Sequence, residues 1–219
     1  MPPKNGVSKQ EDTVRRIISG ATRVFAASGF SGASVDEIAA AAGVNKATIY
    51  YHVGDKEALY GAVLHDVIGN TVARVAAGLS DDQSPQEKLA TYIRGIAATV
   101  EDYPPLPPVM MRAVESGGRN LPQEVATDLV LIFGMLMAIL EEGEEKGAFA
   151  GANPFVVYLM ILGALAFHRN VEATWDEQKK LFAMLKELDS GLYDKLEQMV
   201  KGNVADEVVR MVSKSVSAP

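Results

Sequence analysis

The chain of 219 residues has no cysteine, one tryptophan and only three histidines. Without cysteine it can form no disulfide, hold no cysteine-ligated zinc and use no thiol nucleophile, which suits a cytoplasmic protein. The histidines, His52, His65 and His168, stand at none of the spacings typical of paired metal ligands, such as HExxH. We therefore expect no metal and no cofactor.

Motifs of enzyme active sites are also missing. The sequence has no G-x-S-x-G nucleophile turn, no glycine-rich phosphate loop and no dinucleotide-binding fingerprint. The acidic cluster from Glu141 to Glu145 lies beside Lys146 and Gly147 and is typical of a solvated helix end. Paired carboxylates for acid–base chemistry stay open as an alternative, but no pattern favours them, and we expect a protein that is not an enzyme.

Long apolar runs are scarce. The longest continuous one, Phe155–Phe167, has 13 residues, whereas about 20 are needed to span a bilayer. We expect it to be a buried helix of a soluble protein with no membrane partner. The amino terminus lacks the apolar core of a signal peptide, so secretion is not expected.

Positive charge is in deficit. Lysine and arginine total 21 against 28 aspartate and glutamate, which gives a net charge of −7. Residues 1–60 hold 7 basic and 6 acidic residues, so the acidity belongs to the rest of the chain, with 14 and 22. This balance excludes a polybasic nucleic-acid binder but leaves room for a small DNA-reading surface near the amino terminus.

Signals that start helices recur, whereas strand signals are nearly absent. Serine or threonine followed three residues later by glutamate forms a capping box, and a cap followed by proline also favours a helix start. These patterns begin at Ser8, Ser34, Ser84, Asn153 and Thr174. We predict an all-α fold of about nine to ten helices.

Two segments, Leu129–Leu140 and Phe155–Phe167, are apolar on every side. A helix of this kind must be covered all round. One small core rarely encloses two of them, so we expect part of their surface to face another subunit or a ligand cavity; two ordinary core helices are the alternative. From Trp175 to about Ser215 we expect two or three amphipathic helices, broken near Gly191 and Gly202.

The segment from Ser34 to Leu59 has the pattern of a helix-turn-helix, at about residues 34–53. Ser34 can cap a first helix, and Gly43 can end it in the left-handed conformation. Ala39 provides a small residue where two helices approach closely, and Ile49 provides an apolar anchor for a second short helix.

The outward positions of the second helix carry groups that suit DNA. In this motif the first turn of the second helix enters the major groove, and lysine, threonine and tyrosine can bond bases or phosphates. Alternatively, the tyrosines pack against helices and the lysines are solvated. The predicted DNA-contacting residues are Ser34, Lys46, Ala47, Thr48, Tyr50, Tyr51, His52 and Lys56.

Residues 34–59 resemble the signature of TetR-family transcriptional regulators, in the order of a capped helix, an Ala-Gly-Val turn, a short helix and a Lys-Glu-x-Leu start. The upstream Phe25–Phe30 is similar to the end of the family's first helix. Ala47 stands where glycine is frequent and Val53 where phenylalanine is usual, which bears on the operator read. The quoted motifs are Ile38-Ala39, Ala42-Gly43-Val44, Thr48-Ile49-Tyr50-Tyr51-His52 and Lys56-Glu57-Ala58-Leu59.

The resemblance implies a three-helix DNA-binding head at residues 1–55 and a helical ligand-binding and dimerisation domain at 56–219. It implies a homodimer through late helices, at about 153–170 and 203–215, on a near-palindromic DNA operator. A small apolar or amphipathic effector would release this repressor. The alternative is a helical carrier or scaffold of small molecules whose head no longer binds DNA.

The resemblance also places an effector cavity among the middle helices, at about residues 56–170. Methionine and aromatic side chains make adaptable walls, although the same residues are ordinary core residues. Charges beside this region, His168 among them, could hold a polar end of the effector or form surface salt bridges. The candidate lining residues are Tyr92, Met110, Met111, Phe133, Met137, Tyr158 and Phe167.

Overall fold

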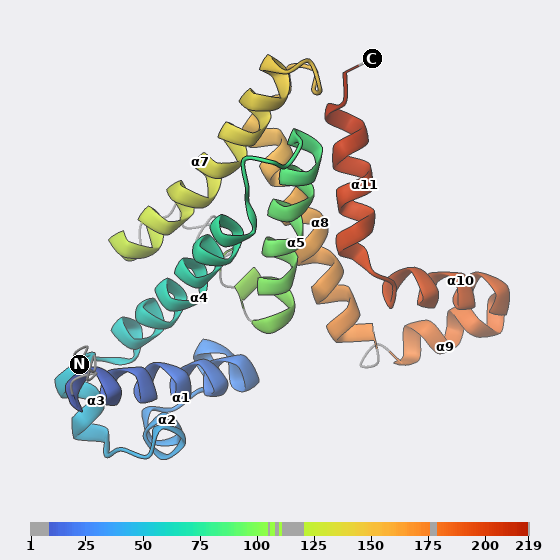
Figure 1. Ribbon diagram of the computed structural model, residues 1–219. Coiled ribbons are helices and arrows are strands. Elements are labelled where there is room, and N and C mark those ends of the chain that lie inside the picture. The colour runs from blue at the N-terminus through green and yellow to red at the C-terminus, as the bar shows by residue number, and fades with distance from the viewer. Residues whose placement is uncertain (1–8, 105, 108–109, 111–120, 176–178, 219) are drawn as a thin grey trace, which may run out of the picture. The chain divides into compact units, whose positions relative to one another are not determined.

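The computed structural model describes residues 9–104, 106–107, 110, 121–175 and 179–218 (Figure 1). These residues form ten helices and no strand, which confirms the predicted all-α fold. The helices are α1 (Lys9–Gly32), α2 (Val35–Ala42), α3 (Lys46–His52), α4 (Lys56–Gly78), α5 (Pro85–Asp102), α7 (Gln123–Glu145), α8 (Pro154–Trp175), α9 (Lys179–Leu188), α10 (Ser190–Val200) and α11 (Val204–Val216).

The described residues divide into two compact units. The first, called the head unit here, contains residues 9–70 and 121–128; the second, the body unit, contains the remainder. Both α4 and α7 contribute residues to each unit. The functional division predicted between residues 55 and 56 stays a prediction.

Helices α1, α2 and α3 of the head unit pack around a few fully buried apolar side chains. Ile17 and Phe25 of α1 are 0% exposed, as are Ile38 of α2 and Ile49 of α3. The α1 and α2 backbones approach closely, since a Cβ added at Gly20 would lie 2.9 Å from the nitrogen of Ala42. Because Ile49 is the buried residue of α3, the second helix of the motif is held by a single buried anchor.

A buried carboxylate links α4 to α7 inside the head unit. Asp128 is only 6% exposed, and its Oδ2 lies 2.6 Å from Nδ1 of His65. A buried carboxylate is costly without a hydrogen-bonding partner, which the imidazole provides. The two residues are 63 positions apart in the sequence.

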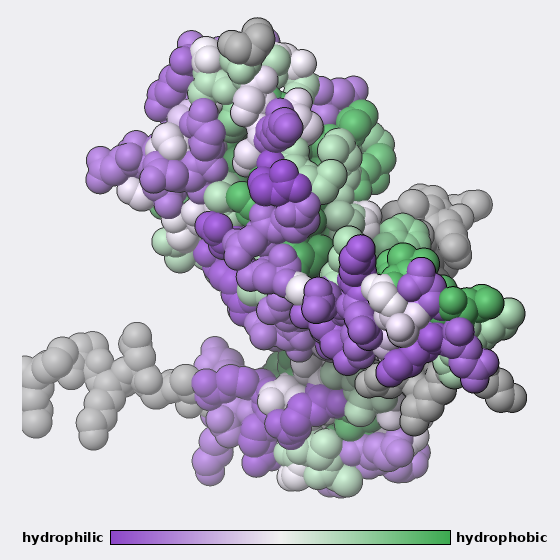
Figure 2. All heavy atoms as spheres, turned by 90° about the vertical axis from the view of Figure 1, so that its right-hand side faces the viewer, coloured by the Kyte–Doolittle hydropathy of each residue, from purple (hydrophilic) through white to green (hydrophobic). Residues whose placement is uncertain are grey.

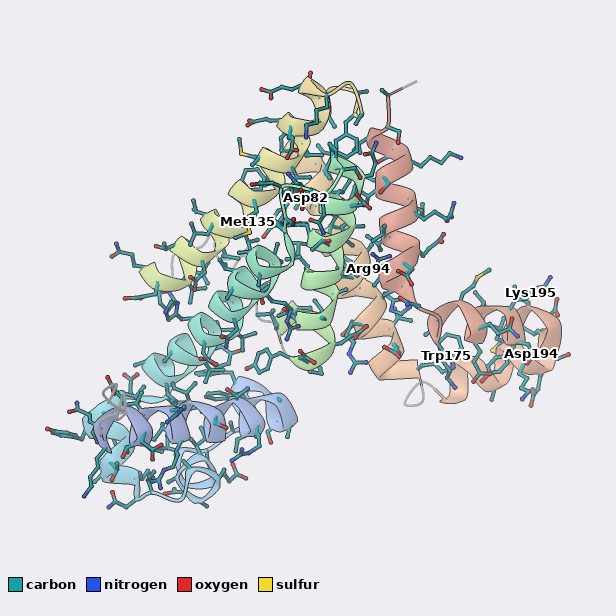
Figure 3. All side chains as sticks on the ribbon, viewed as in Figure 1. Asp82, Arg94, Met135, Trp175, Asp194 and Lys195 are labelled. Atoms are coloured by element: carbon teal, nitrogen blue, oxygen red, sulfur yellow. The ribbon has the colours of Figure 1, made fainter. Side chains whose placement is uncertain are left out.

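The body unit has one continuous apolar core formed mainly by α5, α7, α8 and α11. Helices α5, α8 and α11 pack on one another (Figure 1). Arg94 projects from α5 toward α11 (Figure 3), where it pairs with Asp206 at 3.0 Å. The core side chains that are at most 2% exposed are Val75, Leu89, Tyr92, Ile93, Leu136, Ile161, Leu165, Val212 and Val216.

The loop between α7 and α8 is tied to the end of α11. Phe149 and Ser217 form an isolated antiparallel bridge, and the nitrogen of Ala150 donates to the carbonyl of Val216 at 2.8 Å. The Phe149 ring packs so closely over Gly143 that an added Cβ would lie 2.0 Å from it. This closes the core at the carboxyl end of the described chain.

The late segment forms three helices, α9, α10 and α11, as one of the predicted alternatives stated. Its first break, predicted near Gly191, lies at Asp189, whose carboxylate caps α10 by accepting from the nitrogen of Leu192 at 2.9 Å. Trp175 at the end of α8 lies beside α10 (Figure 3), with its ring 6.1 Å from that of Tyr193. The capping box predicted at Thr174 involves Glu177, which lies outside the described residues.

Helices α7 and α8 leave much apolar surface open. By length and composition, α7 and the first 19 residues of α8 could cross a membrane, as core helices of soluble proteins also could; only 33% and 17% of their most apolar windows are buried. The expected buried helix at Phe155–Phe167 is therefore buried on one face only. Figure 2 shows a face of the molecule on which hydrophobic patches alternate with hydrophilic side chains. The exposed large apolar residues of α8 are Phe155, Val156, Leu159, Met160, Phe167 and Val171.

Candidate nucleic-acid interface

Helix α2 begins with a complete capping box. The nitrogen of Glu37 donates to Oγ of Ser34 at 3.2 Å, and the nitrogen of Ser34 donates to Oε2 of Glu37 at 2.9 Å. The Ser34 hydroxyl also donates to Oε2 of Glu37 at 2.8 Å, and this bond, together with the one from the Ser34 nitrogen, lowers the pKa of the Glu37 carboxyl. The Ser34 hydroxyl is thus committed to the helix start, and its predicted DNA contact remains untested.

The turn between α2 and α3 has the geometry that the sequence predicts. Gly43 is left-handed, with φ of 65°, and the nitrogen of Val44 donates to the carbonyl of Ala39 at 3.0 Å. Asn45 then caps α3, since its Oδ1 accepts from the nitrogen of Thr48 at 2.8 Å. Backbone groups at the end of α2 and at the start of α3 are thus satisfied by residues of the turn itself.

Helix α3 turns most of its surface to solvent. Ile49 is fully buried, whereas Lys46 and Ala47 in the first turn are exposed, and so are Tyr50 and Tyr51 at 49% and 82%. At positions as exposed as these, the packing of the head unit does not require a tyrosine ring. The arrangement leaves one polar face of a short helix free to enter a DNA groove.

Lys46 is paired within the head unit. Its Nζ donates to Oδ2 of Asp36 at 2.9 Å, and this bond raises the pKa of the Lys46 ammonium. Both side chains are largely solvated, so the pair contributes little to stability. The ammonium is therefore available to exchange one oxygen partner for another.

The remaining predicted contacts lie at the end of α3 and the start of α4. His52 is half-buried, with its ring edge-on to that of Tyr51 at 4.9 Å. The Lys56 ammonium lies 4.5 Å from the centre of the Phe30 ring, a cation–π contact. The Asp55 carboxylate accepts from the nitrogen of Ala58 at 2.8 Å and caps α4. Lys56 is thus positioned by an aromatic ring that lies 26 residues upstream.

Two arginines of α1 have a role that sequence reasoning missed. Arg23 donates to the carbonyl of Ala41 at 2.9 Å, and Arg16 donates to that of Gly43 at 3.5 Å. Cations at the carboxyl end of a helix stabilise its dipole. Part of the positive charge of the head unit therefore holds α2 in place.

The predicted effector-pocket residues divide between core and surface. Tyr92 is fully buried in the body core, and Phe133 and Tyr158 stack edge to face at 5.5 Å. Met110 and Met137 are half-buried, whereas Phe167 is 63% exposed. The structure thus brings Tyr92, Phe133 and Tyr158 into one region and leaves Phe167 on the outside; Met111 lies outside the described residues.

Tyr92 is an unusual core residue. Among the described residues its hydroxyl has no hydrogen-bond partner, and burial raises the pKa of this phenol. Burial also raises the pKa of Tyr158. A buried hydroxyl without a partner is unfavourable, so a polar ligand atom beside Tyr92 would be stabilising.

No group of three or more histidine, aspartate or glutamate side chains within the described residues could hold a metal ion.

Comparisons with known proteins agree with this geometry. Residues 17–63 match the family of bacterial regulatory proteins called the tetR family. The chain is 29% identical over 147 residues to the HTH-type transcriptional regulator RutR of Escherichia coli K12, covering 67% of this chain and 69% of RutR. It is 30% identical over 177 residues to the HTH-type transcriptional repressor NicS of Pseudomonas putida, covering 76% and 81%.

A solved structure shows the same fold. The transcriptional regulator FadR from Bacillus subtilis, crystallised in complex with stearoyl-CoA, matches with a TM-score of 0.66 and 22% identity, covering 91% of this chain and 97% of FadR. These relatives are transcriptional regulators and not enzymes. The chain belongs to the TetR family of bacterial transcriptional regulators.

Proposed function

We propose that the protein is a homodimeric repressor that leaves a near-palindromic operator when a small apolar or amphipathic molecule binds its body unit. The observation that carries the DNA-binding part is the open face of α3, anchored by Ile49 alone. Lys46, Thr48, Tyr50 and Tyr51 would contact bases or phosphates from this face. The repressor would act in the cytoplasm.

The exposed apolar side of α8 supports the homodimer. Phe155, Leu159 and Phe167 are more than half exposed, as is Met211 of α11, and large open apolar patches mark association sites. Two copies placed with α8 and α11 face to face would cover these side chains. Two heads would then read half-sites about one DNA turn apart, or a multiple of it.

The unpartnered hydroxyl of Tyr92 supports an effector with a polar atom among the middle helices. The stearoyl-CoA bound by the FadR relative makes a long-chain acyl-CoA a reasonable first effector to test. An effector that prefers one conformation of the body unit would change the affinity for DNA. Lys46 and Tyr50 would thus belong to the DNA-binding site and Tyr92 to the effector site. Binding at one site would change the affinity of the other.

An electrophoretic mobility shift on the DNA upstream of the gene tests the DNA-binding part. The purified protein should shift this DNA at low salt, and Lys46→Ala with Tyr50→Ala should weaken binding tenfold or more. Arg74→Ala is the matched control, because Arg74 forms a similar exposed pair with Asp102 at 2.7 Å in the body unit. The complete absence of a shift by a folded dimer would favour the carrier alternative.

Two further measurements test the dimer and the effector. Light scattering should give twice the mass of one chain, and Leu159→Glu should give monomers, because a charge on this exposed apolar face opposes its burial. Stearoyl-CoA should release the shifted DNA in the wild type. A monomeric wild type contradicts the dimer, and retention of DNA at saturating stearoyl-CoA contradicts this choice of effector.

A further inference from the structure

The body unit contains a small cavity apart from the predicted effector residues. Its volume is about 290 Å³, and it lies between α5, α8 and the connection from α10 to α11. None of the seven residues predicted to line the effector pocket lines this cavity, although His168, considered there as a polar contact, does. Its lining residues are Ala97, Val100, Glu101, Leu165, His168, Arg169, Glu172, Lys201, Gly202, Asn203 and Val204.

The cavity has one apolar wall. Ala97, Val100 and Leu165 are buried, and Val204 at the start of α11 is half-buried. These side chains belong to three helices that pack together in the body core. The apolar wall can therefore accept a short branched hydrocarbon tail.

The opposite wall is charged. Arg169 and Lys201 supply two cations, and Glu101 and Glu172 supply two anions. Arg169 donates through Nη1 to Oε2 of Glu172 at 2.8 Å, which leaves other donors of its guanidinium for a second oxygen acceptor. The two cations and two anions of the lining balance, which excludes a polyanion but suits a single carboxylate with a compensating donor.

Two nitrogens of this wall lack partners. Nε of Arg169 and Nε2 of His168 are buried, and neither forms a hydrogen bond within the described parts of the chain. Buried polar atoms are nearly always hydrogen-bonded, so adjacent exceptions beside a cavity point to a missing acceptor. Both nitrogens are shielded from solvent, so a ligand would engage them after the two side chains turn.

We propose that this cavity binds a small carboxylate that carries an apolar tail and a hydroxyl or ammonium group, as branched-chain hydroxy and amino acids do. The carboxylate accepts from Arg169 and His168, and Lys201 adds a second cationic donor. The hydroxyl or ammonium donates to Glu101, which no ion pair engages in the described residues. The tail lies against Val100 and Leu165.

Four probes of similar shape separate the parts of this proposal. L-leucine and 2-hydroxy-4-methylpentanoate have the carboxylate, the donor and the tail; 4-methylpentanoate lacks the donor, and leucinol lacks the carboxylate. Calorimetric titration of the full chain should show saturable binding, one molecule per chain, by at least one of the first two. The other two should bind at least threefold more weakly. Equal responses, or none with any probe, would overturn the proposal.

Matched variants locate the site. Arg169→Gln should lower the affinity for the probe that binds the wild type tenfold or more, because a charge-assisted hydrogen bond is lost. Arg210→Gln is the control, since Arg210 also pairs with a glutamate three residues away but does not line the cavity. Lys201→Gln changes an exposed side chain and provides a second loss that does not depend on the fold of the first variant.

Glu101→Gln tests the contact between Glu101 and the hydroxyl or ammonium group of the ligand. It should reduce the preference for L-leucine or 2-hydroxy-4-methylpentanoate over 4-methylpentanoate without abolishing binding. Unchanged affinity in both Arg169→Gln and Lys201→Gln would contradict the site. Because binding is measured without DNA, the result is independent of whether the proposed operator binding holds.

Discussion

The head and body units define their helices in different ways. In the head unit, side-chain caps begin both short helices of the motif, a left-handed glycine ends the first, and a few small or branched apolar residues anchor them. In the body unit, long helices are held by a continuous apolar core, while the outer side of α8 stays open. Local signals thus specify the head, whereas the body depends on residues far apart in the chain and, we propose, on a second copy.

The largest expected effect concerns the aromatic core of the head unit. Phe25 is fully buried, with its ring 4.8 Å from that of Tyr60. Phe25→Ala should lower the free energy of unfolding by about 3–5 kcal/mol. Tyr51→Ala, at an 82% exposed position of the same unit, should change it by less than about 0.5 kcal/mol. Urea titrations followed by circular dichroism give the free energy of unfolding of both variants. Similar losses would contradict the role of buried apolar residues as anchors of the head unit.

A glycine of the body unit gives the next effect. Gly143→Ala places a Cβ 2.0 Å from the Phe149 ring, so the α7–α8 loop must move, and we expect a loss of about 1–3 kcal/mol. Gly134→Ala, in the same helix, meets no atom within 4 Å and should add about 0.5–1 kcal/mol. Melting temperatures should move in opposite directions. A gain with Gly143→Ala would contradict the close packing.

Equivalent capping boxes allow a direct comparison of the units. Ser34 caps α2 in the head, and Ser84 caps α5 in the body. Each substitution by alanine should cost about 1 kcal/mol of unfolding free energy. Hydrogen exchange should show faster exchange in the first turn of α2 for Ser34→Ala and of α5 for Ser84→Ala. Faster exchange spread over both units from either variant would mean that the units do not unfold separately.

The smallest effect is the acid sensitivity of these boxes. Hydrogen bonds from Ser34 and Ser84 lower the pKa of Glu37 and Glu87 from the ordinary value of 4.5. A carboxyl with a lowered pKa stabilises the fold above 4.5, and this stabilisation is lost as the pH falls through its folded value. Glu37→Gln and Glu87→Gln should therefore flatten the stability curve below pH 4.5. Unchanged acid sensitivity in both variants would contradict the assigned bonds.

Sequence reasoning succeeded where the signal is local. Ser34 and Gly43 predict the start and the end of the first helix of the motif because each satisfies backbone groups within a few residues. The break predicted near Gly191 lies at Asp189, two residues earlier, where the Asp189 side chain caps the next helix.

Contacts between distant residues were beyond such reasoning. No local pattern connects His65 with Asp128, or Arg94 with Asp206 112 positions away. The cavity beside Arg169 was missed for the same reason, since its walls come from three separate stretches of chain. The all-round apolar segment of α8 predicted that part of its surface would face another subunit or a ligand cavity. Which face of the helix stays exposed is seen only from the packing of the core.

The Lys46–Asp36 pair has a consequence for selectivity on the proposed DNA-binding face. Asp36 keeps a negative charge, 73% exposed, next to the ammonium that would meet the operator. An arriving phosphate must displace this resident carboxylate and tolerate its repulsion. Stray polyanions that offer only charge gain little from that exchange, whereas an operator that also fits Thr48 and Tyr50 gains enough to complete it. Asp36 would thus compete with DNA phosphates for Lys46 and disfavour weak non-specific binding.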